Sequence, residues 1–130
     1  MAIERLRANE QSSRTVTFTL LDNASLPVLF ADVATAQLTL FDMDTYVPGG
    51  SPVTGIINTR DAQNVLNTND VTIAATSGLV TWSMQPEDNL IVTVRKQIER
   101  HRAEFRFVTT SGAELDYQFE VEVVNLRKAS

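Results

Sequence analysis

The most constraining feature of the sequence is a regular alternation of apolar and polar residues over two consecutive stretches, residues 101–109 and 114–124. An alternation with a period of two places every second side chain on the same face of a β-strand. The residues expected to face inward are His101, Ala103, Phe105, Phe107, Leu115, Tyr117, Phe119, Val121 and Val123. The two stretches therefore predict a pair of half-buried antiparallel strands whose outer face is charged.

The turn between these stretches fixes how the two strands pair. The sequence Thr110-Ser111-Gly112 predicts a three-residue loop with the glycine in the left-handed conformation. The cross-strand pairs that follow from this loop are Phe107 with Leu115, Phe105 with Tyr117, Arg106 with Asp116, and Arg102 with Glu120. A register one pair along would set Glu104 against Glu120, and like charges directly opposite one another are unfavourable. The first register is therefore expected.

Further strands are indicated along the chain. Residues 14–20 and 35–43 alternate in the same way, and their inward positions are Val16, Phe18, Leu20, Ala36, Leu38 and Leu40. Residues 71–84 predict a β-hairpin whose two-residue turn is Ser77-Gly78. Residues 28–30 and 90–94 are two shorter candidates, and Pro27 restricts the first of them to the edge of a sheet.

One short helix is expected over residues 60–66. Asn58 or Thr59 can cap it, and Asp61 lies early enough to oppose the helix dipole. Val65 and Leu66 are its only large apolar residues, so such a helix can contact a core along one edge but cannot form the core.

About seven short strands with one brief helical segment define an all-β class, and the immunoglobulin-like antiparallel β-sandwich fits best. A small β-barrel is the alternative, because alternation does not say whether a sheet closes. The sandwich domain is expected over residues 14–126, followed by a tail at 127–130. Residues 1–13 are expected to be an N-terminal arm, either a frayed terminus with a nascent helical turn or a segment that docks on a neighbouring subunit.

Charge and composition exclude several classes. The chain has 130 residues with 16 Asp and Glu against 11 Lys and Arg, and its net charge of −5 opposes binding to nucleic acid or anionic lipid. It has no cysteine, so the fold cannot depend on disulfides or thiolate metal sites, and a reducing cytosol suits it. No apolar run has the length of a signal peptide or of a membrane span. Neither nucleic acid nor a membrane is expected as a partner.

Side chains that could carry chemistry are few. His101 is the only histidine, which excludes multi-histidine metal sites, and its place on the apolar face of a strand is typical of a structural histidine. Asp42 and Asp44 have the spacing of the first two ligands of a calcium loop, but the remaining ligands and the glycine do not follow. Nucleotide-binding glycine motifs and a nucleophile elbow are also missing from the sequence. We therefore expect no enzymatic activity, no catalytic residue, no metal and no cofactor.

Several phrases of the sequence resemble small structural proteins of tailed-bacteriophage virions. They are NTRDAQNVLN at 58–67, VTI at 71–73, GLVTW at 78–82, QPED at 85–88, and the strand at 101–107 together with VVNL at 123–126. The resemblance covers most of the chain after Arg14. It implies an immunoglobulin-like, non-enzymatic virion component, most simply a capsid decoration or minor head protein that binds other virion proteins. A neck, tail or baseplate adaptor is the alternative within the same class.

The implied localisation is the virion, with the host cytoplasm during assembly, and a homo-oligomer is a further partner to consider. Two other classes stay open: a carbohydrate-binding sandwich module, which would need an exposed aromatic platform, and a cytosolic regulator or inhibitor. The residues expected to make protein contacts are Ile3, Arg5, Leu6, Arg7, Tyr46, Arg60, Asp61 and Asn64.

Overall fold

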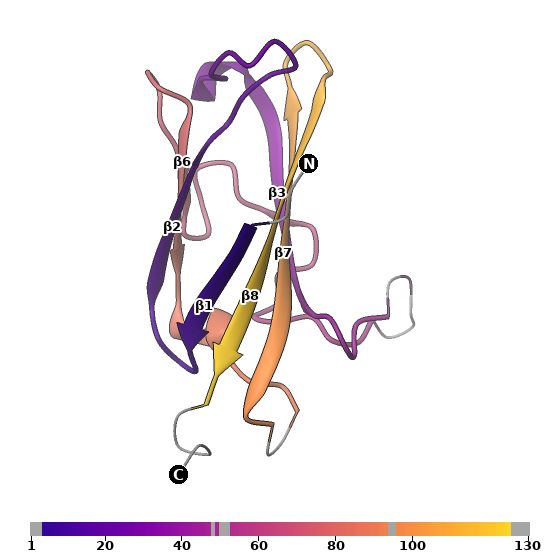
Figure 1. Cartoon of the computed structure of the whole chain (residues 1–130). Coiled ribbons are helices and arrows are strands. Elements are labelled where there is room, and N and C mark those ends of the chain that lie inside the picture. The colour runs from indigo at the N-terminus through magenta and orange to yellow at the C-terminus, as the bar shows by residue number, and fades with distance from the viewer. Residues whose placement is uncertain (1–3, 48, 50–52, 94–95, 126–130) are drawn as a thin grey trace.

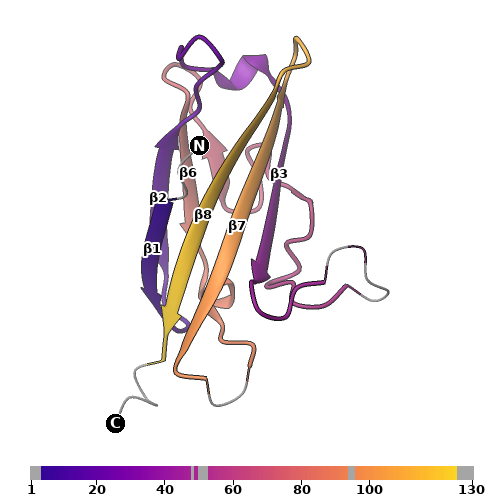
Figure 2. The ribbon, with the colours of Figure 1, turned by 45° about the vertical axis from the view of Figure 1, so that its right-hand side comes forward.

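The chain folds into two facing β-sheets (Figures 1 and 2). The computed structural model describes residues 4–47, 49, 53–93 and 96–125. The strands are β1 (Glu4–Asn9), β2 (Arg14–Thr19), β3 (Val33–Asp42), β4 (Gln63–Asn64), β5 (Val71–Ile73), β6 (Leu79–Met84), β7 (Ile98–Thr109) and β8 (Glu114–Val124). Two short 3-10 helices, η1 (Phe30–Asp32) and η2 (Pro86–Asn89), complete the described elements.

The strand order defines an immunoglobulin-like β-sandwich. One sheet has five strands in the order β1-β8-β7-β3-β4, and the other has three in the order β2-β6-β5. All neighbours are antiparallel except β1 and β8, which run parallel. The two sheets stay open at their edges and form a sandwich, not a barrel, which confirms the expected fold class.

The pairing of β7 with β8 confirms the predicted register. Phe107 lies opposite Leu115, and Glu104 faces Gln118 instead of Glu120. The loop closes as expected: the Thr109 N–H donates to the Ala113 carbonyl at 2.9 Å, and Gly112 adopts a φ of +93°. The remaining predicted pairs, Phe105 with Tyr117, Arg106 with Asp116, and Arg102 with Glu120, are also present. Local charge and turn chemistry were therefore sufficient to select this register.

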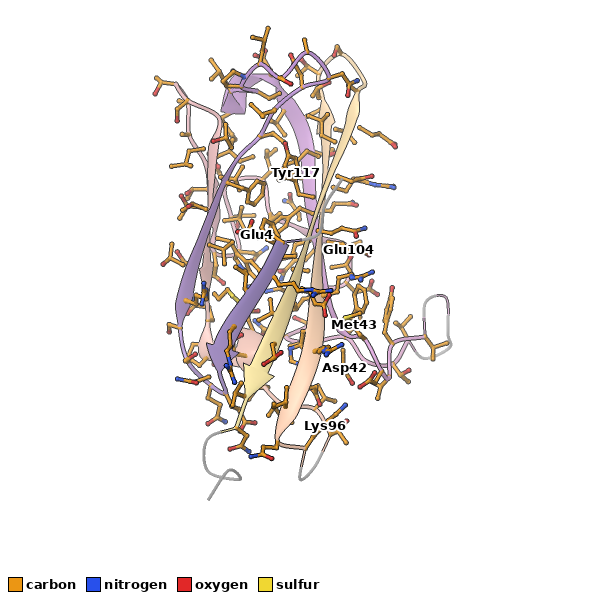
Figure 3. The ribbon with its side chains drawn as sticks, in the orientation of Figure 1. Glu4, Asp42, Met43, Lys96, Glu104 and Tyr117 are labelled. Carbon is orange, nitrogen blue, oxygen red and sulfur yellow. The ribbon has the colours of Figure 1, made fainter. Side chains whose placement is uncertain are left out.

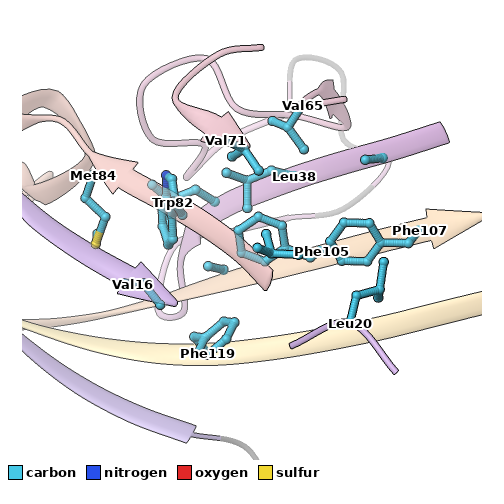
Figure 4. Packing of buried hydrophobic residues seen from close by; sticks show 14 of the residues in the cluster. Val16, Leu20, Leu38, Val65, Val71, Trp82, Met84, Phe105, Phe107 and Phe119 are labelled. Carbon is cyan, nitrogen blue, oxygen red and sulfur yellow. The ribbon is translucent and has the colours of Figure 1, made fainter. Parts of the chain in front are cut away.

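The core lies between the two sheets and is centred on Phe105 (Figure 4). The Phe105 ring meets the Trp82 ring edge-on with centroids 5.4 Å apart, and meets the Phe119 ring edge-on at 6.0 Å. Phe18, from the opposite sheet, lies 5.4 Å from the same ring. Trp82 is fully buried. Trp82 thus packs on an aromatic neighbour, and edge-to-face pairs of this kind add stabilisation beyond the buried area.

The predicted helix over residues 60–66 is wrong. The segment is irregular and contains only the two-residue strand β4, which pairs with β3. The residues that open the expected helix, Asn58, Thr59 and Ala62, have φ values of 53°, 55° and 48°. These angles are incompatible with a right-handed helix and are unfavourable for a branched residue such as Thr59. The reason is tertiary, because the Arg60 side chain is drawn into the interior, as described below.

The N-terminal segment is also different from the expectation. Residues 4–9 form neither a frayed terminus nor a helical turn, because β1 pairs in parallel with β8 and belongs to the sandwich itself. Ala8 is buried, and Leu6 packs against the core cluster. The sandwich therefore begins well before residue 14, and the described part of the arm docks on its own chain.

Three shorter predictions differ in detail. Residues 28–30 and 90–94 do not contain a strand among their described residues, although the Val28 N–H still donates to the Leu20 carbonyl at 2.8 Å.

The hairpin of β5 and β6 is confirmed, but its turn is longer than two residues, since the Ala74 N–H donates to the Leu79 carbonyl at 2.8 Å. Gly78 has a φ of +70°, and a Cβ there would lie 2.8 Å from the Val28 carbonyl oxygen. Both the angle and the close approach require glycine.

The importance of the central ring can be tested with Phe105→Ala. Removing it leaves a cavity between the sheets, so the free energy of unfolding should fall by about 3–5 kcal/mol. The measurement is urea denaturation followed by the fluorescence of Trp82. Arg106→Ala is the matched control on the exposed face of β7 and should change stability by less than about 0.5 kcal/mol. Equal effects of the two substitutions would contradict the description of the core.

Candidate functional site

The expected contact residues of β1 lie on the outer face of the five-stranded sheet. Arg5 and Arg7 are exposed, and their Nε atoms lie 3.8 Å from a Glu120 oxygen and 3.6 Å from a Glu122 oxygen. Arg100 on β7 joins them, and together these side chains surround a shallow depression of about 370 Å³. Leu6 faces the core and is only partly accessible, and Ile3 lies outside the described residues. Pairs at these distances with an exposed arginine contribute little to stability and leave the arginine charges available to a partner.

The loop that follows β3 extends away from the sandwich, as Figures 1 and 2 show for its described residues 43–47 and 53–56. Tyr46 stacks on Phe41 with ring centroids 4.2 Å apart and an interplanar angle of 26°. Val47, beyond Tyr46, is 52 % exposed and forms a bridge with Thr54. The loop therefore presents an apolar side chain to solvent from a position held by stacking and backbone pairing.

The base of this projecting loop is fixed by Asp42. Its carboxylate accepts a hydrogen bond from the Thr45 hydroxyl at 2.7 Å, and its carbonyl accepts the Tyr46 N–H at 3.0 Å. On the returning side, the Asp42 N–H donates to the Gly55 carbonyl at 2.8 Å. Gly55 has a φ of +84°, and a Cβ there would lie 2.6 Å from the Tyr46 Cα. The two arms of the loop are thus packed against each other where they leave the sheet.

Arg60, expected as a contact residue, is instead buried. Its side chain is 1 % exposed, and its Nε donates to Asp88 Oδ1 at 2.5 Å while Nη2 donates to Asp88 Oδ2 at 3.0 Å. Nη2 also donates to Asp70 at 2.9 Å, and Nη1 to the Gln63 side chain at 2.7 Å. Asp61 and Asn64 remain on the surface, in agreement with a contact role, but Arg60 is not available to a partner.

This Arg60 network explains the irregular backbone around it. Burial alone would lower the pKa of Arg60, but the hydrogen bonds and charges of Asp88 and Asp70 outweigh burial and raise it, so the guanidinium stays charged. Asp88 in turn accepts the N–H of Gln85 at 2.8 Å at the start of η2 and the Asn58 side-chain amide at 2.9 Å. A helix over residues 60–66 would have to break this paired arrangement.

A second buried polar group lies at the lower end of β3 and β7 in the view of Figure 3, where Asp42 and Lys96 are labelled. We call Asp42, Glu99 and His101 the carboxylate–histidine cluster. All three side chains are fully buried, and their potential ligand atoms lie within 4.8 Å of one another. Asp42 and His101 are cross-strand partners, and Glu99 lies two residues before His101 on the same face of β7. The β3–β7 pairing therefore brings the cluster together.

Hydrogen bonds fix the positions of Glu99 and His101 within the cluster. Glu99 accepts the backbone N–H groups of Val92 at 2.8 Å and Thr93 at 2.9 Å, and its Oε1 lies 2.5 Å from His101 Nε2. Burial would raise the pKa of Glu99, but the hydrogen bonds from Val92, His101 and Thr93 outweigh burial and lower it. Burial lowers the pKa of His101, and the Glu99 carboxylate offsets this effect only in part. Glu99 is thus held as a carboxylate beside a neutral imidazole.

The sequence located only part of this arrangement. The predicted strand began at residue 101 and placed His101 on its inward face, but Glu99, two residues earlier, is also buried. The alternation that predicts an inward His101 continues backwards by two residues to Glu99, and that signal could have found it. Asp42 was considered only with Asp44, which is exposed and pairs with Lys96 at 2.5 Å.

The comparisons with known proteins include a distant structural likeness. No protein-family model matches the chain, and no curated protein matches its sequence. Among solved structures, the first immunoglobulin-like domain of human CD48 antigen aligns with 95 % of this chain and 84 % of that chain, at 18 % sequence identity and a TM-score of 0.38. The assignment of the chain to the immunoglobulin-like sandwiches follows from the strand order and pairing given above. Among the described residues, no helix is long and apolar enough to cross a membrane.

The Arg60 network predicts a large and specific loss of stability. Arg60→Met leaves the Asp88 carboxylate buried without its partner, and the free energy of unfolding should fall by about 3–5 kcal/mol in chemical denaturation. Adding Asp88→Asn removes the stranded charge and should restore part of that loss. The neighbouring exposed substitution Asp61→Ala should change stability by less than about 0.5 kcal/mol. If Arg60→Met were as mild as Asp61→Ala, the network would not hold this segment.

Proposed function

We propose that the chain is a non-enzymatic structural component of a tailed-bacteriophage virion, most simply a capsid decoration or minor head protein that binds other virion proteins. The observation that carries the protein-binding role is the projecting loop after β3. It leaves the sandwich from a fixed base and presents Val47 at 52 % exposure. The virion assignment is supported by the sequence resemblance given above.

The loop has the properties of a preorganised contact. The Tyr46–Phe41 stack, the Asp42 hydrogen bonds and the Val47–Thr54 bridge hold it before any partner is bound. A loop that is already ordered loses less conformational entropy on association, so a small apolar contact can suffice. Copies on a symmetric particle would also attach at several points, and multivalency reduces the affinity needed from each contact.

The charged face of β1 and β8 is the second surface that supports this proposal. Arg5, Arg7, Glu120 and Glu122 give it both signs of charge. Mixed charges of this kind favour specificity and orientation over general adhesion. Because the chain as a whole is acidic, the proposal includes neither nucleic acid nor a membrane as a partner.

We favour the alternative functions less. A neck, tail or baseplate adaptor would use the same two surfaces and would differ in copy number per particle. A carbohydrate-binding module would need exposed aromatic rings, but Trp82 is buried, Tyr46 is stacked on Phe41, and the Tyr117 hydroxyl donates to the Thr19 carbonyl at 3.3 Å. An active-site groove beside His101 would need Phe105 and Trp82 to line it, and both lie in the core.

The virion assignment is tested by mass spectrometry of gradient-purified particles of the phage that encodes the chain. The expected result is a fixed ratio of this chain to the major capsid protein, with many copies for a decoration protein and few for a neck or tail part. Absence from the particles, with the chain found only as a soluble monomer in the lysate, would contradict the proposal and favour a cytosolic regulator.

The contact itself is tested by adding purified variants to particles that lack the chain. Val47→Asp places a charge on the exposed apolar side chain of the loop and should reduce occupancy at least tenfold while leaving the melting temperature unchanged. Leu79→Asp is the matched control, since Leu79 is 41 % exposed on the other sheet. Deletion of residues 1–13 is not a clean test, because Leu6 and Ala8 pack in the fold. Equal occupancy of the two variants would remove the loop from the interface.

A further inference from the structure

We propose that Asp42, Glu99 and His101 bind one divalent first-row transition metal ion, with Zn²⁺ as the best fit. The three side chains come from two neighbouring strands, are fully buried, and offer ligand atoms within 4.8 Å of one another. The sequence led us to expect no metal, because it has a single histidine and an incomplete calcium loop, but this site needs only one histidine. It is independent of the proposed virion role.

The kind of ligand selects the kind of metal. Two carboxylates and one imidazole give two oxygen ligands and one nitrogen ligand, and Zn²⁺ binds both kinds of ligand. Ca²⁺ and Mg²⁺ prefer oxygen ligands alone, so the imidazole disfavours them.

The charge of the cluster also favours a cation. Asp42 and Glu99 place two carboxylates in the interior, where a charge is costly unless it is compensated. Among the described residues, the nearest ammonium group is that of Lys96, and it is bound to Asp44 at 2.5 Å. A dication between the three side chains would balance the two carboxylates directly.

A separate observation also favours a bound ion at this site. His101 Nδ1 is buried and has no hydrogen-bond partner among the described residues, although Nε2 is bound to Glu99. A buried ring nitrogen without a partner is uncommon, because desolvation is not repaid. Metal-binding histidines use one ring nitrogen for the ion and the other for a hydrogen bond. The His101 ring thus has Nε2 engaged by Glu99 and Nδ1 buried without a partner, next to two buried carboxylates.

The cluster lies beside a segment that is partly open to solvent. Glu99 accepts hydrogen bonds from the backbone N–H groups of Val92 and Thr93, and Val92 is 45 % exposed, so the segment beside the cluster is partly open to solvent. Asp42 also holds the base of the projecting loop. A bound ion would therefore stiffen the point from which that loop leaves the sandwich.

The direct test uses the fact that His101 is the only histidine. In ¹⁵N-labelled, tag-free protein the imidazole gives a single pair of nitrogen signals. Titration with ZnCl₂ should shift one of them strongly and saturate at one equivalent, with an increase in melting temperature that EDTA reverses. Unshifted imidazole nitrogens at saturating Zn²⁺ would overturn the proposal, and this readout does not depend on any variant folding.

Variants separate this site from general carboxylate binding. Asp42→Asn and His101→Gln should each weaken Zn²⁺ binding at least tenfold by calorimetry, because loss of even an outer-sphere partner costs about 10–100-fold. Asp44→Asn is the matched control: it removes a carboxylate two residues away that is exposed and outside the cluster, and it should bind Zn²⁺ like the parent. Equal affinity in all three variants would place the ion elsewhere and contradict the assignment. Ca²⁺ binding as tight as Zn²⁺ binding would contradict the choice of metal.

Discussion

The contact of the two sheets through Phe105 is the interaction on which the rest of the structure depends. The chain has no cysteine, so the cross-sheet bond that holds many immunoglobulin-like domains is replaced here by aromatic packing. Phe105 and Phe119 from one sheet meet Trp82 and Phe18 from the other. Because these rings are brought together by strand alternation alone, any change of register on β7 would turn the core outward. The charged outer pairs, although individually weak, keep that register unique.

The polar groups that the fold buries lie away from this aromatic centre. Arg60 with Asp88 organises the irregular segment between β3 and β5, and the carboxylate–histidine cluster lies where β3 ends and β7 begins. Each group forms hydrogen bonds to a segment that lies outside the long paired strands. The first holds an unfavourable backbone at residues 58–62, and the second includes the residue that fixes the base of the projecting loop. The base of the projecting loop is therefore held by the buried Asp42 carboxylate, and the two sheets form the rigid frame.

The sequence predicted what is local and missed what depends on distant residues. The β7–β8 register followed from a three-residue loop and neighbouring charges, all within 24 residues of chain. The helix at residues 60–66 failed because Arg60 binds Asp88, 28 positions away, and no local pattern shows that pairing. Strand β1 was missed for the same reason, since its partner β8 is at the opposite end of the sequence. Of the expected contact residues, Arg5, Arg7, Asp61 and Asn64 are on the surface, Tyr46 and Leu6 are partly covered, and Arg60 is not accessible.

The central claim is that the space between the sheets is dry and filled with aromatic rings, and the single tryptophan reports on it directly. The decisive measurement is the quenching of Trp82 fluorescence by iodide in the native protein. A side chain with no exposed surface should emit at short wavelength and resist quenching until the chain is unfolded in denaturant. Strong quenching of the folded chain, with emission at the wavelength of a hydrated indole, would contradict the sandwich core and with it the protein-binding role that we propose.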